Sequence, residues 1–147
     1  MKVLVDLNVV LDVLLDRQPW VTESKQVWDA HVAEDISGWL VATELTNLFY
    51  IVRQFTDATK ARTAVRTCLT TFDVLGVDQA ILDDADSQSG TDFEDNVLIA
   101  AAVARGMDVI VTRNPQDFAH SPIEVLSPAE LLERLATLDA PPASANP

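Results

Sequence analysis

Short apolar runs alternate with longer stretches in which apolar residues recur at helical spacing. The runs have the length of buried strands, and we predict five of them, at residues 2–5, 36–41, 72–75, 108–112 and 123–126. Helices are predicted at residues 9–15, 21–33, 43–55, 59–69, 92–105 and 128–138. A further helix is predicted to begin at residue 79, and a polar segment at residues 83–90 is predicted to follow it. Strands separated by helices favour an α/β fold, with a parallel sheet covered by helices on both faces.

Capping and terminating residues support several of these boundaries. Asp78 is expected to cap the helix that begins at Gln79, and Gly106 is expected to end the helix before it. No internal repeat is visible, so residues 1–138 are expected to form one domain. Residues 139–147 are rich in Pro and Ala and are expected to be a disordered tail.

Composition narrows the class of protein. The chain has 147 residues, of which 48% are hydrophobic, and this is enough for a packed core. No apolar run approaches the roughly 18 residues of a membrane span, and the N-terminus does not resemble a signal peptide. Cys68 is the one cysteine, so a disulfide framework is excluded. These features predict a cytoplasmic protein that does not enter a membrane.

Glycine usage excludes two common phosphate-binding devices. The chain has four glycines, and none forms the G-x-G-x-x-G or G-x-x-x-x-G-K turn after the first strand. Dinucleotide and P-loop sites are therefore not expected, and any phosphate must be held in another way.

Four carboxylates stand at junctions that a parallel sheet brings to one edge. Asp6 ends the first strand, and Glu44 opens the helix after the second. Asp95 lies near the start of an alanine-rich helix, and Asp117 follows the fourth strand. Four acids without a basic partner repel one another unless cations neutralise them, and carboxylates suit Mg²⁺ or Mn²⁺. The pattern indicates a divalent-metal site, for which phosphodiester hydrolysis is the first chemistry to consider.

The first two acids also have structural explanations. Asp6 could cap the helix that follows it, although Asn8 could take the same role. Glu44 could only complement the dipole of a helix that is capped by Thr43. Its position directly after a strand end favours a functional role.

The segment at residues 91–95 holds three acids with different expectations. Thr91 and Glu94 have the spacing of a capping box, which would bind Glu94 to the backbone. Asp92 gains from the helix dipole, while Asp95 is expected one turn further on, where that gain has faded. The two aspartates share a helix face, and Asp95 is the preferred candidate, with Asp92 supporting it.

Polar residues also crowd the end of the fourth strand. Thr112, Asn114 and Asp117 lie in a segment that is too polar and rich in turn residues to be core. Asn114-Pro115 is consistent with an ordinary turn, but the location at a strand end favours function. In contrast, His31 and His120 lack a second histidine at ligand spacing, and Cys68 follows an apolar helical pattern. These last three residues are expected to be structural.

Charge constrains the partners. The formal net charge of −13 argues against a simple nucleic-acid binder, although acids that bind metal ions would be largely neutralised. Four of the bases are clustered, at Arg53, Lys60, Arg62 and Arg66.

Taken in order, these motifs resemble the PIN domain. The resemblance is carried by Val-Asp-Leu-Asn-Val-Val-Leu-Asp at residues 5–12, by Glu44, by Asp-Phe-Glu-Asp at 92–95 and by Val-Thr-Arg-Asn-Pro-Gln-Asp-Phe at 111–118. It covers residues 1–138. The form at 92–95 and the closing Ser-Pro-Ile-Glu-Val-Leu-Ser-Pro-Ala-Glu resemble the bacterial branch that includes VapC-type toxins.

The resemblance implies a three-layer α/β/α fold around a parallel sheet of about five strands, and Mg²⁺- or Mn²⁺-dependent ribonuclease activity that leaves a 5′-phosphate and a 3′-hydroxyl. It assigns the acidic, metal-binding quartet to Asp6, Glu44, Asp95 and Asp117. It assigns supporting roles to Asn8, Thr112 and Asn114, which would hold water, the metal or the loop in place, while Asp92 is a supporting candidate from its place on the helix face alone. Leu7 departs from the commoner small polar residue, and its side chain is expected to point away from the ligands.

The resemblance also implies partners, namely an RNA substrate, a small basic antitoxin and a second copy of the chain. An acidic protein suits a basic antitoxin. The basic cluster would be an RNA track or part of a dimer surface, and the sequence does not choose between them.

Two other functions remain open. One is a catalytically silent PIN-fold binding module, which the complete quartet disfavours. The other is a receiver-type signalling domain, which needs a lysine at a late strand end. The lysines here are Lys2, Lys25 and Lys60, and none fills that place. Structured DNA is the alternative substrate, because recognition of the 2′-hydroxyl is not readable from the sequence.

Overall fold

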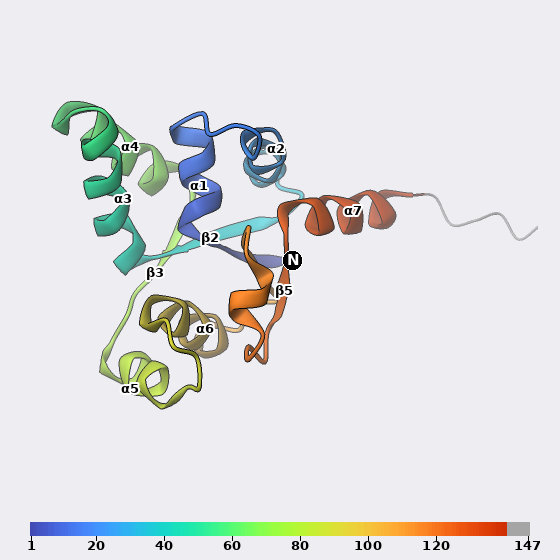
Figure 1. The fold of residues 1–147 in the computed structure, drawn as a ribbon. Coiled ribbons are helices and arrows are strands. Elements are labelled where there is room, and N and C mark those ends of the chain that lie inside the picture. Colours follow the sequence, from blue (N-terminus) through green and yellow to red (C-terminus); the bar gives the residue numbers. More distant parts are fainter. Residues whose placement is uncertain (141–147) are drawn as a thin grey trace, which may run out of the picture.

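A five-stranded parallel sheet forms the middle layer of the computed structural model, which describes residues 1–140 (Figure 1). The strand order is β3-β2-β1-β4-β5, and every neighbouring pair is parallel. The strands are β1 (Lys2–Val5), β2 (Ser37–Val41), β3 (Asp73–Leu75), β4 (Val109–Val111) and β5 (Glu124–Leu126). All five lie where the hydrophobic pattern predicts them.

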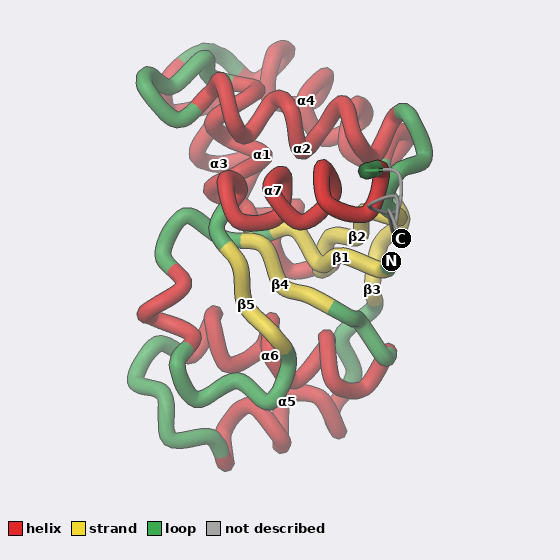
Figure 2. The backbone as a smooth tube through the Cα atoms, turned by 90° about the vertical axis from the view of Figure 1, so that its right-hand side faces the viewer, coloured by secondary structure: helices red, strands yellow, loops and turns green. Residues whose placement is uncertain are grey.

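Helices cover both faces of this sheet, as Figure 2 shows from the side. One layer contains α1 (Leu7–Leu14), α2 (Val21–Val32), α3 (Ala42–Phe55), α4 (Ala58–Thr71) and α7 (Pro128–Asp139). The other contains α5 (Gln79–Ser87) and α6 (Phe93–Arg105), and a short 3₁₀ helix, η1 (Pro115–Phe118), follows β4. The predicted three-layer α/β/α architecture is confirmed.

Alternation along β1 explains why both layers are needed. Val3 and Val5 pack into the core beneath α1, α2, α3, α4 and α7, whereas Leu4 packs into the core beneath α5 and α6. Successive side chains of a strand point to opposite faces, so a strand that is apolar throughout must be covered on both sides. This arrangement leaves the ends of the strands as the place for polar chemistry.

Helix ends follow the predicted signals in part. Asp78 caps α5 by accepting a hydrogen bond from Ile81 N (3.0 Å), and Gly106 ends α6 with a φ of 65°. The predicted polar segment at 83–90 is partly wrong. The helix α5 continues to Ser87, since Ala85 lies one turn after Ile81 and is buried with it.

Other boundaries differ by a residue or two. The first helix begins at Leu7 rather than at residue 9, and α7 ends at Asp139, one residue beyond the predicted end of the domain. The rest of the predicted tail, apart from Ala140, lies outside the described residues. In the described part of the chain, no helix combines the length and the apolar character that crossing a membrane requires.

His31 and Cys68 have the structural roles that the sequence predicts. His31 Nε2 lies 2.6 Å from Thr71 O, Nδ1 lies 3.0 Å from Gly38 N, and the ring stacks on Phe72. The imidazole therefore accepts from Gly38 and donates to Thr71, which joins α2 to β2 and α4. Cys68 is fully buried, and burial raises the pKa of its thiol to about 12, so it behaves as a small core residue.

His31→Ala should lower the free energy of unfolding by about 2 kcal/mol, because Gly38 N–H and Thr71 C=O lose their partner. Urea unfolding measures this change. Gln26→Ala, an exposed position on the same helix, should stay within about 0.5 kcal/mol of the original protein. Equal stability of the two variants would contradict the role given to His31.

Candidate active site

Asp6 lies where two neighbouring strands end together. Its backbone N–H donates to Val111 O of β4 (2.9 Å), and its Oδ2 accepts from Thr112 Oγ1 (2.8 Å). Although Asp6 occupies the N-cap position of α1, its side chain makes no capping hydrogen bond. The capping explanation is therefore wrong for Asp6, and also for Asn8, which lies inside the first turn of the helix.

Glu44 is buried at the start of α3 and binds two backbone groups. Its Oε1 accepts from Leu7 N (2.8 Å), and its Oε2 accepts from Val41 N (3.3 Å). Val41, not Thr43, occupies the N-cap position, because α3 follows β2 without a connecting loop. Glu44 thus closes the start of its own helix and also fixes the start of α1 beside it.

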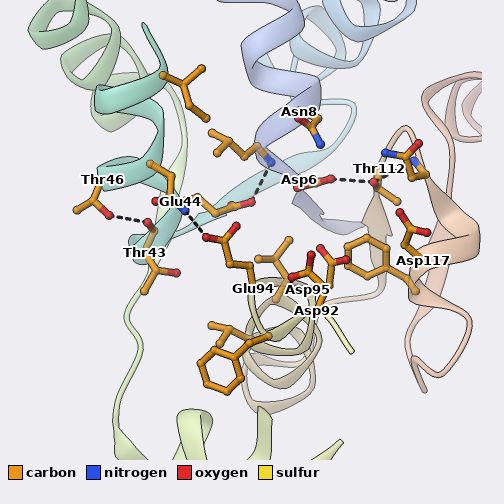
Figure 3. A pocket seen from close by; sticks show the side chains of 18 of the residues that line it. Asp6, Asn8, Thr43, Glu44, Thr46, Asp92, Glu94, Asp95, Thr112 and Asp117 are labelled. Carbon is orange, nitrogen blue, oxygen red and sulfur yellow. Dashed lines mark hydrogen bonds between the residues drawn. The ribbon is translucent and has the colours of Figure 1, made fainter. Parts of the chain in front are cut away.

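The start of α6 differs from the predicted capping box. The helix begins at Phe93, so Asp92 holds the N-cap position and its Oδ1 accepts from Asp95 N (3.2 Å). Asp95 consequently lies in the first turn rather than one turn further on. Glu94 instead accepts a hydrogen bond from Asn47 Nδ2 (3.0 Å), which links α6 to α3 (Figure 3). The predicted pairing of Thr91 with Glu94 is wrong because the helix starts one residue later than expected.

The segment after β4 is ordered by its own side chains. Thr112 Oγ1 donates to Asp6 and accepts from Asn114 N (3.2 Å). Asp117 follows in η1, where its N–H donates to Asn114 O (3.0 Å). The turn that the sequence indicates is thus present, and it also directs polar residues toward Asp6.

One pocket of about 670 Å³ joins these elements (Figure 3). All eight residues that the sequence singles out line it: Asp6, Asn8, Glu44, Asp92, Asp95, Thr112, Asn114 and Asp117. The four candidate acids are therefore not scattered over separate surfaces. Leu7 lines the same pocket, and its side chain also packs against the core beneath α1.

Sequence reasoning missed the far end of this pocket. Asn47 lines it three residues after Glu44 on α3, and this helical spacing could have identified it. Tyr50, Leu82 and Phe93 also line it and are exposed, at 66%, 40% and 50% respectively. No sequence signal marks these three residues, because they come together only where α3 from one layer and α5 and α6 from the other line the same pocket.

Burial raises the pKa values of three of the acids, and repulsion from neighbouring acids adds to the rise for two of them. Desolvation is the larger cause for Glu44, whose pKa lies well above its ordinary range, and the charge of Asp6 adds to it. Desolvation also raises the pKa of Asp6. The pKa of Asp95 is raised to about 7, first by desolvation and then by the charges of Asp92, Asp6, Asp117 and Glu94. Without a cation, these acids therefore hold protons more tightly than ordinary carboxyl groups, and a metal ion could take the place of those protons.

The donor set fits a hard divalent cation. Carboxylate and amide oxygens are the groups that Mg²⁺ and Mn²⁺ prefer, and a cation would remove the repulsion around Asp95. Among residues 1–140, no three His, Cys, Asp or Glu side chains already stand close enough together to hold an ion. Binding would therefore have to draw the carboxylates inward, and water would complete the coordination shell, as Mg²⁺ commonly requires.

Comparison with known proteins gives a family and a fold. The family model of the PIN domain matches residues 2–116. A toxin–antitoxin complex from Klebsiella pneumoniae is similar over 86% of this chain and 97% of that chain, with 23% identity and a TM-score of 0.65.

Two further solved structures have the same fold. DNA-bound VapBC from Salmonella typhimurium is 15% identical, with a TM-score of 0.66, over 87% of this chain and 98% of that chain. VapC20 from Mycobacterium tuberculosis, a sarcin-ricin loop cleaving toxin, is 14% identical, with a TM-score of 0.61, over 74% and 86%. No curated protein matches.

The pKa of Asp95 predicts how stability depends on pH. Without metal, the folded state holds this proton more tightly than the unfolded chain, whose Asp pKa is near 3.8. The resulting stabilisation is complete below that value and is lost as the pH rises through about 7. Urea unfolding in EDTA should therefore show lower stability at about pH 8 than at about pH 5.5. The dependence should be weaker in Asp95→Asn, and equal slopes for the two proteins would contradict the assignment.

Proposed function

This chain belongs to the PIN domain family, and from that premise we propose that it is an endoribonuclease that hydrolyses RNA phosphodiester bonds with Mg²⁺ or Mn²⁺. We further propose that it is the toxin of a toxin–antitoxin pair, of the VapC type. The observation that carries the proposal is the pocket in which four carboxylates from distant parts of the chain lie together, with no Lys, Arg or His among the residues that line it.

We assign the metal to Asp6, Glu44, Asp95 and Asp117. When bound, a divalent cation polarises the phosphate, supplies an activated water and stabilises the leaving oxygen. Thr112 orients the carboxylate of Asp6 through its hydroxyl, and the backbone N–H groups of Leu7 and Val41 orient that of Glu44. These contacts orient Asp6 and Glu44 before a cation draws the other carboxylates toward them, and such partial preorganisation lowers the cost of reaching the transition state.

The supporting residues have different tasks. Asp92 caps α6 and so fixes the turn that carries Asp95. Asn8 and Asn114 line the same pocket and offer amide groups that can orient water or a phosphate oxygen. None of the three needs to contact the scissile bond itself.

RNA is the substrate that we favour over structured DNA. The pocket extends from the acids to the exposed side chains of Tyr50 and Phe93, and aromatic rings of this kind stack on unpaired bases. One protein of similar fold is a sarcin-ricin loop cleaving toxin. Cleavage of DNA in preference to RNA by the purified protein would reverse this choice.

The partners follow from the same proposal. The net charge of −13 suits a small basic antitoxin, and one protein of similar fold was solved as a toxin–antitoxin complex. We also propose a homodimer and a cytoplasmic location, where RNA is accessible. Whether such an antitoxin binds this chain is tested by co-purifying the chain with the protein that a neighbouring reading frame encodes.

Purified protein should cleave RNA in the presence of Mn²⁺ or Mg²⁺, and cleavage should stop when EDTA removes the metal ion. Asp6→Asn and Asp95→Asn should each lower kcat by about 100-fold or more, since even indirect partners of metal ligands cost about 10–100-fold. A labelled-oligonucleotide cleavage assay measures both. Asp29→Asn, an exposed acid on α2, is the matched control and should keep full activity.

Cleavage that persists in EDTA or in Asp95→Asn would contradict the proposed mechanism. Calorimetric titration with Mn²⁺ separates the remaining alternative. A folded protein that takes up no Mn²⁺ and cleaves no RNA would be a silent PIN-fold binding module instead.

A further inference from the structure

Arg113 lies between two residues of the candidate site in the sequence, but its side chain contacts α1 instead of lining the pocket. Thr112 and Asn114 on either side of it line the pocket, whereas Arg113 does not. Its Nε lies 3.0 Å from Oδ2 of Asp12, and its side chain is only 18% exposed. Asp12 lies on α1, the helix that starts directly after Asp6, and is fully buried. An ion pair thus joins the segment after β4 to α1. Arg113 does not line the pocket, although its charge lowers the pKa of Asp6.

Two further residues enclose this ion pair. Ser24 Oγ on α2 donates to Asp12 Oδ2 (3.0 Å). The Arg113 guanidinium stacks over the Trp20 ring, 4.3 Å from its centroid, and this arrangement adds a cation–π attraction. The charges are therefore packed among side chains that limit where the Arg113 side chain can lie.

Stability alone does not explain a buried pair of this kind. Removing two charges from water costs as much as their attraction returns, and an apolar pair of similar volume is often at least as stable. In the described part of the chain, Asp12 Oδ1 and Arg113 Nε also have no hydrogen-bond partner, which adds to the cost. The contact between Arg113 and Asp12 is thus an ion pair without a hydrogen bond. What the pair provides instead is an attraction between charges that holds the guanidinium between Asp12 and the Trp20 ring.

We propose that Asp12 and Arg113 are positioning residues that hold the 112–117 segment against α1. The strands themselves fix only the start of this segment, through Thr112 N donating to Leu126 O (3.0 Å). Asn114 N bonds only within the segment, to Thr112 Oγ1. Asp6 directly precedes α1, and Arg113 directly follows Thr112. The ion pair of Arg113 with Asp12 therefore holds Thr112 close to the helix that Asp6 begins, and so supports the Thr112–Asp6 hydrogen bond.

The consequence is that Asp12 and Arg113 set the geometry of the pocket without touching it. The expected effects of Asp12 and Arg113 on metal binding and catalysis rest on the proposed function. The effect on the order of the segment is independent of any activity.

The test compares Arg113→Met with the double variant Asp12→Leu/Arg113→Met. Arg113→Met leaves a buried Asp12 unpaired and should lower stability in urea, while the double variant should recover stability, because an apolar pair replaces the charges. In both variants, the Asn114 amide should exchange its hydrogen at least about 10-fold faster than in the original protein. Mn²⁺ affinity and kcat should be about 10–100-fold lower in both, with KM for RNA little changed.

Arg134→Met is the matched control. It breaks the Arg134–Glu124 ion pair, with N–O distances of 2.6 Å, on the surface between β5 and α7. Exchange at Asn114, Mn²⁺ affinity and kcat should all stay as they are in the original protein.

A double variant that recovers slow exchange at Asn114 together with its stability would overturn the proposal, because the pair would then be merely structural. If Arg113→Met does not fold, Arg113→Lys tests the proposal in its place. Lysine keeps the charge but loses the planar group that stacks on Trp20, so exchange at Asn114 should rise, and unchanged exchange would overturn the proposal.

If the original protein neither binds Mn²⁺ nor cleaves RNA, the proposed function fails. Exchange at Asn114 still decides whether the pair positions the segment.

Discussion

Mutual repulsion among carboxylates at one edge of the sheet is the constraint on which this architecture depends. Parallel pairing of β1 with β4 places Asp6 beside Thr112, and the starts of α3 and α6 bring Glu44 and Asp95 to the same pocket. Burial strengthens the repulsion, since it removes the water that would otherwise screen the charges. The fold tolerates this cost through backbone N–H groups, a threonine hydroxyl and the raised pKa values of the acids.

Much of this arrangement is predictable from the sequence because it follows from periodicity. Apolar runs identify the five strands, and their separation by helices favours the parallel pairing that the sheet has. Since the carboxyl ends of parallel strands meet at one edge, acids that follow strands are predicted to meet there. The same reasoning places Asp6 and Asp117 in one pocket although they lie near opposite ends of the domain sequence.

The contacts that were missed depend on distances between elements, which no local pattern encodes. A one-residue shift in the start of α6 gives the capping role to Asp92 and frees Glu94 to bind Asn47. The contact of Arg113 with Asp12 needs the segment after β4 to pass close to α1. Each residue looks like an ordinary surface or helix residue until the sheet order is known.

Anomalous diffraction from crystals grown with Mn²⁺ tests the central claim most directly, because it locates the cation without relying on activity. We expect an anomalous peak in the pocket, within coordinating distance of the carboxylates of Asp6 and Asp95, and a weaker peak or none in Asp95→Asn. A well-ordered pocket with no peak at saturating Mn²⁺, or a peak only elsewhere on the protein, would contradict it.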